Sequence, residues 1–147
     1  MDKKTTGELR KLLNGIKDGE ELENYINNEI PPQGSISFHD YFNSYLEEKH
    51  LEKPKIIQAS GINRTYAYQI LKGEKNPSRD KVLALALAAN MDLNDINQCL
   101  KLAGMNELYE KSRKDAIIIF ALNKGNLSMS DLDELLFEMG EEPFSPL

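Results

Sequence analysis

The chain has 147 residues, of which 40% are hydrophobic and 29% are charged, and its net charge is -6. It is long enough to bury a hydrophobic core as one domain or as a domain with appendages, and too apolar to be disordered. Its single cysteine cannot form an internal disulfide, which fits a reducing compartment. No run approaches the roughly 18 apolar residues of a membrane span, and the first residues lack the apolar stretch of a signal peptide. We therefore expect a soluble, cytoplasmic protein with no membrane partner.

Two short helices are predicted in the N-terminal part of the chain. Thr5 with Glu8 is a candidate capping box for a helix over about residues 8–16. Asp18 can cap a second helix, whose apolar residues recur at helical spacing: Leu22, Tyr25, Ile26 and Ile30. The sequence PPQGS at 31–35 interrupts this pattern and indicates a linker. We therefore interpret residues 1–35 as a helical arm that ends in a Pro-Pro linker.

The next part of the chain predicts three helices in close succession. Ser37 with Asp40 can cap the first, which extends to about residue 49. Its larger side chains form one stripe that is interpreted as core: Phe38, Tyr41, Phe42, Tyr45 and Leu46. Residues 53–60 (KPKIIQAS) predict a second helix, and residues 63–72 predict a third after a turn at Gly61. Two short helices joined by a tight turn are typical of a helix-turn-helix, in which the second helix enters a DNA groove.

Helices are also predicted throughout the remaining sequence. Ser78 or Asp80 can cap a helix to about residue 89, and Asn90 suits the left-handed position that ends it. Because this helix is apolar almost all round, several neighbours must cover it. Residues 94–103 and about 108–123 predict two more helices, Ser130 is the candidate cap of the last, and EEPFSPL at the end is interpreted as a tail. No segment predicts a strand, so we expect an all-α protein.

Positive charge is concentrated around the predicted helix pair. Residues 53–81 contain seven basic side chains and two acidic ones, a local charge of +5. The flanking segments 1–52 and 82–147 carry -5 and -6. A basic segment in an acidic chain, centred on the predicted groove-binding helix, is typical of a phosphate-binding face. By itself it also fits a solvated, lysine-rich helix pair.

The most specific sequence elements are Gly61-Ile62-Asn63-Arg64-Thr65-Tyr66, Ile70, Gly73, Asn76-Pro77-Ser78, Leu83, Leu85-Ala86 and Asn90. With them, the segment from about Ser37 to Ala103 resembles the Xre-type (Cro/C1-like) helix-turn-helix domain of phage repressors and bacterial regulators. The resemblance implies a five-helix bundle over residues 36–104. Residues 105–147 would then be a C-terminal helical extension, packed on the bundle or in a dimer contact. The RKDAIIIFAL segment within it is similar to an extension found in some bacterial regulators of this type.

The resemblance also implies roles for particular side chains. The groove-facing positions at the start of the third helix of such domains are Arg64, Thr65, Tyr68 and Gln69. Arg64 can donate two hydrogen bonds to a guanine edge, and Gln69 can pair with adenine. The implied phosphate contacts are Lys53, Asn63, Lys72, Lys75 and Asn76. Ala67 and Ile70 are expected to face inward, whereas Tyr66 can either pack or direct its hydroxyl to a phosphate.

The chain departs from the family pattern at several positions. Lys53-Pro54 opens the second helix where a glutamine is usual, Ile57 replaces an alanine and Ser60 a leucine. Leu71 and Leu87 occupy positions that are usually polar surface, so we expect them under the added terminal helices or in a dimer contact. These departures leave an alternative open: a protein adaptor of the same fold that has lost DNA binding and uses its acidic flanking helices to bind a partner.

Nothing in the sequence predicts an enzyme, a metal site or a cofactor. His39 and His50 have no cysteine partner at metal-binding spacing, and Cys99 is interpreted as a core residue. The acidic residues from Asp131 to Glu134 complement the dipole of a helix N-terminus. The expected partners are double-stranded DNA and a second copy of the chain, because a homodimer on a pseudo-palindromic site contacts two half-sites about one helical turn apart.

Overall fold

The computed structural model describes residues 5–29, 36–125 and 127–147. These ranges contain nine α-helices and no strand, so the all-α prediction is confirmed. The chain divides into two compact units, Met1–Ser35 and Ile36–Leu147. The predicted linker at 31–35 lies outside the described residues. Across the described ranges, no helix combines the length and the apolar composition that crossing a bilayer requires.

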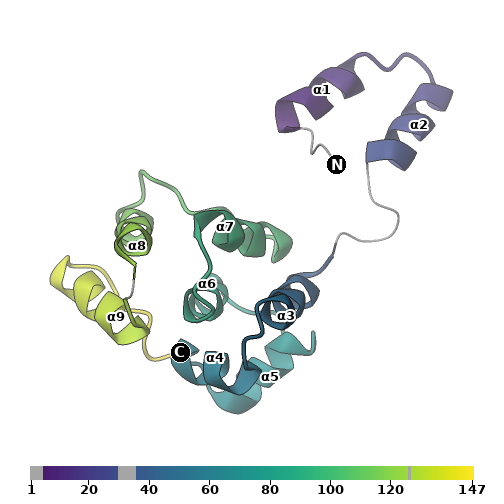
Figure 1. Ribbon diagram of the computed structural model, residues 1–147. Coiled ribbons are helices and arrows are strands. Elements are labelled where there is room, and N and C mark those ends of the chain that lie inside the picture. Colours follow the sequence, from purple (N-terminus) through teal and green to yellow (C-terminus); the bar gives the residue numbers. More distant parts are fainter. Residues whose placement is uncertain (1–4, 30–35, 126) are drawn as a thin grey trace. The chain divides into compact units, whose positions relative to one another are not determined.

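The N-terminal unit contains a pair of contacting helices, α1 (Thr6–Asn14) and α2 (Gly19–Glu29), shown in Figure 1. Thr5 and Asp18 both cap their helices as predicted, although only one of the two bonds of the predicted Thr5–Glu8 capping box is present. The Thr5 Oγ1 atom accepts a hydrogen bond from the Glu8 N–H at 3.1 Å, and Asp18 Oδ1 accepts one from the Glu21 N–H at 2.8 Å. Each cap satisfies a backbone donor that the first helical turn leaves free. Local sequence therefore sets where these two helices begin.

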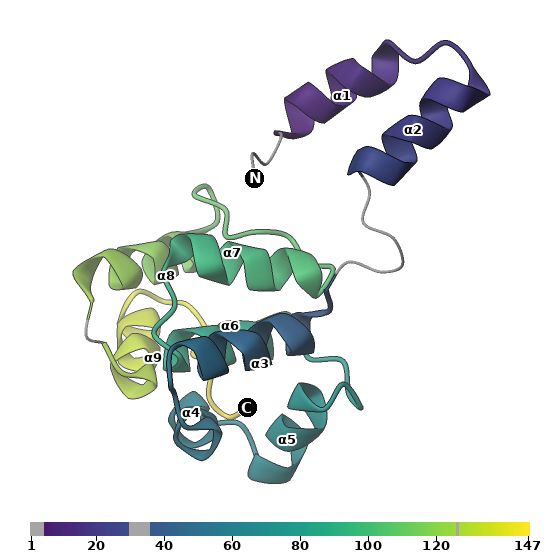
Figure 2. The ribbon, with the colours of Figure 1, turned by 45° about the vertical axis from the view of Figure 1, so that its right-hand side comes forward.

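The second unit contains the other described helices: α3 (Phe38–Glu48), α4 (Lys53–Ser60), α5 (Arg64–Leu71), α6 (Arg79–Ala88), α7 (Leu93–Leu102), α8 (Arg113–Lys124) and α9 (Met129–Glu138). Helix α6 lies in the middle of this unit in both Figure 1 and Figure 2. It contacts α4, α7 and α9, while α3 contacts α5 and α7. All five residues from Val82 to Ala86 are buried, which confirms that a helix with no polar face needs cover on several sides. Asn90 adopts the predicted left-handed conformation, with φ 57°.

One buried ion pair joins α6 to the C-terminal helices. The Arg79 guanidinium makes two hydrogen bonds to the Asp115 carboxylate, at 3.0 and 2.9 Å, and the Asp115 side chain is only 7% exposed. Arg79 also donates to the backbone carbonyls of Asn106 and Glu107. Asp115 in turn accepts from the Tyr109 N–H at 2.9 Å. The pair therefore fixes the α7–α8 loop as well as the start of α8.

The prediction of a helix from about residue 108 was wrong at its start, because its first residues belong to this loop. Helix α8 begins only at Arg113, with Ser112 as its cap. The preceding residues use their backbone groups for tertiary contacts instead of helical ones: the Leu108 N–H donates to Asn97 Oδ1 at 2.9 Å, and Leu108 itself is buried. A helical turn there would break these contacts, so the tertiary structure overrides the local preference.

Two further predictions at the C-terminus were wrong. The last helix is capped by Ser128, not Ser130, because Ser128 and Asp131 form a reciprocal capping box. The segment 141–147 is not a free tail. Phe144 is only 3% exposed, Lys114 Nζ lies 4.7 Å from its ring centroid, and the Asp133 carboxylate accepts from the N–H groups of Phe144 and Ser145. One aromatic side chain thus anchors the end of the chain.

We expect the Asp115→Asn variant to lose about 2–3 kcal/mol of unfolding free energy, because Arg79 would keep its charge without a counter-ion. The loss stays below that of a fully buried pair because the Arg79 side chain is 33% exposed. Urea unfolding of the full chain measures it.

The matched control is Lys55→Ala, which breaks an ion pair with Glu52 whose side chains are 77% and 67% exposed. This variant should change stability by less than about 0.5 kcal/mol. Equal effects of the two substitutions would show that the Arg79–Asp115 pair does not hold the C-terminal helices.

Candidate nucleic-acid interface

The turn between α4 and α5 is held by local interactions. Gly61 ends α4 in the left-handed region, with φ 78°. The buried Ser60 hydroxyl donates to the Ile57 carbonyl at 2.6 Å and accepts from the Ile62 N–H at 3.2 Å. A leucine at this position could make neither bond, so the departure at Ser60 stabilises the turn. Asn63 Oδ1 accepts from the Tyr66 N–H at 3.1 Å and caps α5, as predicted.

Helix α5 has one buried face and one accessible face. Ala67, Ile70 and Leu71 are at most 2% exposed, which confirms the inward orientation predicted for Ala67 and Ile70. The residues predicted to contact bases occupy the other face: Arg64 and Thr65 are exposed, and Tyr68 and Gln69 are half-buried. The Arg64 guanidinium carbon lies 5.8 Å from the centroid of the Tyr68 ring. These side chains therefore form one surface, which can present a planar donor group beside an aromatic hydroxyl.

Leu71 is only 2% exposed, at the end of a helix that contacts α3 and α4. Asn43 Nδ2 donates to the Leu71 carbonyl at 2.8 Å. This bond satisfies a carbonyl at the C-terminal end of α5. It fixes the point at which the chain leaves the helix.

The residues predicted to contact phosphate lie at the two ends of the α4–α5 pair. Lys53 is half-buried in the first turn of α4, and Asn63 uses its side chain as the α5 cap. Lys72, Lys75 and Asn76 are exposed at the end of α5 and in the loop that follows. In that loop the N–H groups of Glu74 and Lys75 both donate to the Gln69 carbonyl, at 2.9 and 3.3 Å. The loop is therefore tied back to the helix that carries the predicted base contacts.

The structure adds one cation to this surface that the sequence did not assign. Lys81 Nζ lies 5.0 Å from the centroid of the Tyr66 ring, so the first turns of α5 and α6 are neighbours. This contact also places Tyr66, whose role the sequence left open, beside a positive charge. The sequence places Lys81 in the basic segment, in the first turn after Asn76-Pro77-Ser78, but it does not reveal the contact with Tyr66.

Ion pairing changes the charge that the basic segment presents. Arg79 is neutralised by Asp115, and Lys55 pairs with Glu52 at 3.2 Å. Among the described residues, five cations of the segment form no ion pair: Lys53, Arg64, Lys72, Lys75 and Lys81. One of the segment's two acids, Asp80, lies 3.7 Å from Lys114. Four of these cations lie on α5, in the loop after it or at the start of α6, and Lys53 lies in the first turn of α4. We call the surface of these five cations, together with Thr65, Tyr68 and Gln69, the α5 face.

The single cysteine is buried and has the properties of a core residue. Cys99 is fully buried, as predicted, and burial raises its pKa to about 12, with Asp95 adding to the shift. It remains protonated at neutral pH and lies 3.5 Å from Met91 Sδ. The described residues contain no cluster of three or more His, Cys, Asp or Glu side chains suited to a metal ion.

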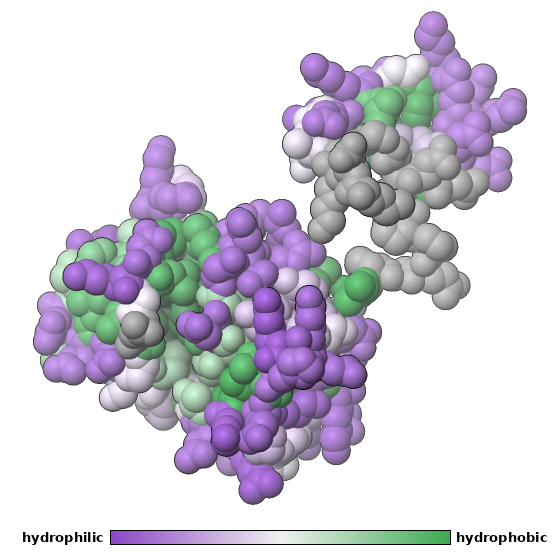
Figure 3. Space-filling view, viewed as in Figure 1, coloured by the Kyte–Doolittle hydropathy of each residue, from purple (hydrophilic) through white to green (hydrophobic). Residues whose placement is uncertain are grey.

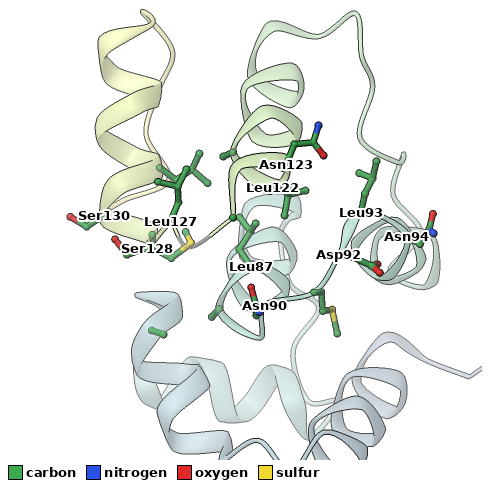
Figure 4. Close-up of a pocket in the computed structure, with 17 residues that line it drawn as sticks. Leu87, Asn90, Asp92, Leu93, Asn94, Leu122, Asn123, Leu127, Ser128 and Ser130 are labelled. Atoms are coloured by element: carbon green, nitrogen blue, oxygen red, sulfur yellow. The ribbon is translucent and has the colours of Figure 1, made fainter.

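An apolar groove of about 860 Å³ lies in another part of the unit, where the ends of α6 and α8 meet the beginnings of α7 and α9. Figure 4 shows Leu87, Leu93, Leu122 and Leu127 around it, with Asn90, Asp92 and Ser128 also along its lining. Leu87 therefore lies beside the C-terminal helices, one of the two locations expected for it. In Figure 3 an apolar band runs over this region, whereas the surface around α4 and α5 is mostly polar. The unit thus has two chemically different surfaces.

No family model, curated protein or solved structure matched this chain in the comparisons.

The shape of the loop after α5 should depend on Gly73. Its φ is 81°, and an added Cβ would lie 2.7 Å from the His39 ring, whereas Gly61 has a similar φ of 78° with no atom within 4 Å. We expect Gly61→Ala to cost about 1 kcal/mol from backbone strain alone, and Gly73→Ala to cost roughly 1 kcal/mol more. Thermal or urea unfolding of the two variants gives the difference.

A His39→Ala background tests the source of that difference. The ring that obstructs the new methyl group is then gone, so Gly73→Ala should cost no more than Gly61→Ala. If the excess persists without His39, the contact with this ring does not position the loop.

Proposed function

We propose that this protein is a sequence-specific DNA-binding transcriptional regulator in which α4 and α5 form a helix-turn-helix. The observation that carries the proposal is the composition of the α5 face. Helix α5 is packed through Ala67, Ile70 and Leu71, and its opposite side presents guanidinium, hydroxyl and amide groups that could bind DNA. A rigid helix with one packed side and one donor-rich side suits insertion into a major groove.

The residues divide by their chemistry into two roles. Arg64, Thr65, Tyr68 and Gln69 would contact base edges, since guanidinium and amide groups form the bidentate pairs that distinguish guanine and adenine. Lys53, Asn63, Lys72, Lys75 and Asn76 would contact phosphates on either side, and Lys81 extends this set. Phosphate contacts supply affinity without sequence preference. The resemblance of residues 37–103 to Xre-type domains, and the five-helix repressor-like bundle that it implies, agree with this division.

The regulator would act in the cytoplasm as a homodimer on a pseudo-palindromic site. One α5 face covers only a few base pairs, whereas two copies on half-sites about one helical turn apart give a longer and more specific site. The site itself can be found by selecting bound sequences from a random duplex pool.

On the selected site, Arg64→Ala should weaken binding by about 1–3 kcal/mol and relax the preference at one position. Lys72→Ala should instead weaken binding to all sequences alike and reduce the slope of log K against log salt by about one unit. Fluorescence anisotropy at several salt concentrations measures both effects.

The control is Lys111→Ala, which removes an exposed lysine from the α7–α8 loop, on the side of the unit away from α5 in Figures 1 and 2. It should leave affinity and salt slope unchanged. The groove assignment is wrong if Arg64→Ala behaves like Lys111→Ala.

A second candidate function is an adaptor that binds another protein. The apolar groove favours it, because Leu87, Leu122 and Leu127 could receive apolar side chains of a partner. The acidic helices outside the basic segment would contribute to such an interaction. The same titration separates the two functions: a regulator shows salt-dependent binding to duplex DNA, and an adaptor of this kind shows none.

A further inference from the structure

Arg64 and Tyr68 lie about one helical turn apart on the accessible side of α5. The Arg64 guanidinium carbon is 5.8 Å from the centroid of the Tyr68 ring, within the roughly 6 Å over which an aromatic face attracts a cation. Arg64 is exposed, and its guanidinium forms no ion pair among the described residues. The ring is therefore the group that can orient this cation before it contacts DNA.

The Tyr68 ring is itself held in place. It is half-buried and packs against the hydrophobic core, on a helix that is fixed through the buried Ala67 and Ile70. A tyrosine has few side-chain torsions, whereas an unrestrained arginine loses much rotamer freedom when it is ordered. A fixed ring beneath a flexible guanidinium thus reduces the entropy that Arg64 loses on binding.

The hydroxyl group of Tyr68 is poorly suited to distinguish bases. A phenol can donate to acceptors of guanine, adenine and thymine, and it can accept from the amino groups of adenine and cytosine. A guanidinium, in contrast, makes two hydrogen bonds that match the major-groove edge of guanine. The base preference of the pair would therefore come from Arg64, and the contribution of Tyr68 from its ring.

A second tyrosine of α5 carries a cation of a different kind. Lys81 Nζ lies 5.0 Å from the centroid of the Tyr66 ring, and Tyr66 is also half-buried against the core. An ammonium group is a point charge without the planar fork of a guanidinium, so it suits a phosphate better than a base edge. The two tyrosines thus support two different cations, which allows a matched comparison within one helix.

We propose that Tyr68 is a positioning residue that holds the Arg64 guanidinium for a guanine and so determines specificity at one base pair. This role replaces the direct base contact that the family resemblance implies for Tyr68. The inference rests on the proposed function for its effect on DNA, whereas the pairing of Arg64 with the ring is a property of the free chain. The two parts can therefore be tested separately.

NMR of the Arg64 side chain in the free, full-length protein tests the pairing. Protons over an aromatic ring are shifted upfield by its ring current, and this shift should persist in Tyr68→Phe and Tyr66→Leu but be lost in Tyr68→Leu. Tyr68→Met supplies a second side chain without a ring and with high helix propensity, and circular dichroism checks that each variant keeps its fold. An Arg64 signal that is the same with and without the Tyr68 ring would overturn the inference, whether or not the chain binds DNA.

Fluorescence anisotropy measures the effect on specificity. It compares the selected duplex with one in which the guanine is replaced at the position where Arg64→Ala relaxes the preference. Tyr68→Phe should keep the ratio of the two dissociation constants, and Tyr68→Leu should lower it roughly three- to tenfold, as expected when a cation loses its aromatic support. The matched control, Tyr66→Leu, should weaken both duplexes alike through Lys81 and keep the ratio.

The Arg64→Ala background shows whether Tyr68 acts through Arg64. There, Tyr68→Leu should leave the dissociation constant for the selected duplex unchanged, because the cation that the ring supports is already gone. Further weakening in that background, or a ratio lowered as much by Tyr68→Phe as by Tyr68→Leu, would show that Tyr68 contacts a base itself and would overturn the inference.

Failure of this inference differs from failure of the proposed function. A chain that selects a DNA site but keeps its specificity in Tyr68→Leu would contradict the inference alone. A chain that binds no duplex DNA would contradict the proposed function, and the NMR shift would still show whether Tyr68 holds Arg64.

Discussion

The arrangement of the second unit depends on the buried pair of Arg79 and Asp115. A carboxylate that is 7% exposed is costly to bury, and here it receives two bonds from Arg79 and one from the Tyr109 N–H. Because Arg79 is the first residue of α6 and Asp115 lies in the first turn of α8, the pair fixes one helix relative to the other. Helix α9, which contacts both α6 and α8, then covers the apolar surface of α6. By fixing α8 relative to α6, this ion pair allows α9 to bury the apolar surface of α6.

The Arg79–Asp115 pair also determines which positive charges of the basic segment are accessible to solvent. A count of side chains places Arg79 in the basic segment, but its guanidinium is turned toward Asp115 and two backbone carbonyls. Of the cations without an ion pair among the described residues, Lys53 lies at the start of α4, and the others lie on α5, in the loop after it or at the start of α6. Lys81, two residues after Arg79, lies on the other side of the turn, over the ring of Tyr66. One helical turn of α6 therefore contributes both to the core and to the α5 face, and its two basic residues have opposite roles.

The sequence predicted the helix caps, because each cap depends on residues that are close together in the chain. Caps at Thr5, Asp18, Ser37 and Asn63 each need a side chain and a backbone donor three residues apart, and all four are present. The limits of α4 and the buried side of α5 follow from equally local patterns. The α5 face was predicted as a set of positions, and the structure shows that these positions share one surface. It does not show which of them touch DNA.

What the sequence could not predict depends on partners far along the chain. Asp115 lies 36 residues from Arg79, and no local pattern links the two. Asp133 binds the backbone of Phe144 in the same non-local way, so a segment with two prolines and two glutamates looked like a free tail. Ser128 and Ser130 both resemble caps, and only the reciprocal bond with Asp131 distinguishes them. In the first two cases a tertiary contact decides between structures that local propensity leaves equal. The Ser128 cap is local, because Asp131 lies three residues away, so the Ser-x-x-Asp pattern in the sequence could have identified it.

The second unit carries two surfaces of different chemistry, the α5 face and the apolar groove. A surface that binds DNA must stay accessible and charged, whereas a surface that binds a second copy must become dry and apolar. On a bundle as small as the second unit, one side is already taken by the α5 face and the core is closed by α8 and α9. The apolar groove lined by Leu87, Leu122 and Leu127 lies in another part of the same unit. A regulator of the proposed kind would use the first surface and an adaptor the second, so the two candidate functions require different parts of one small bundle.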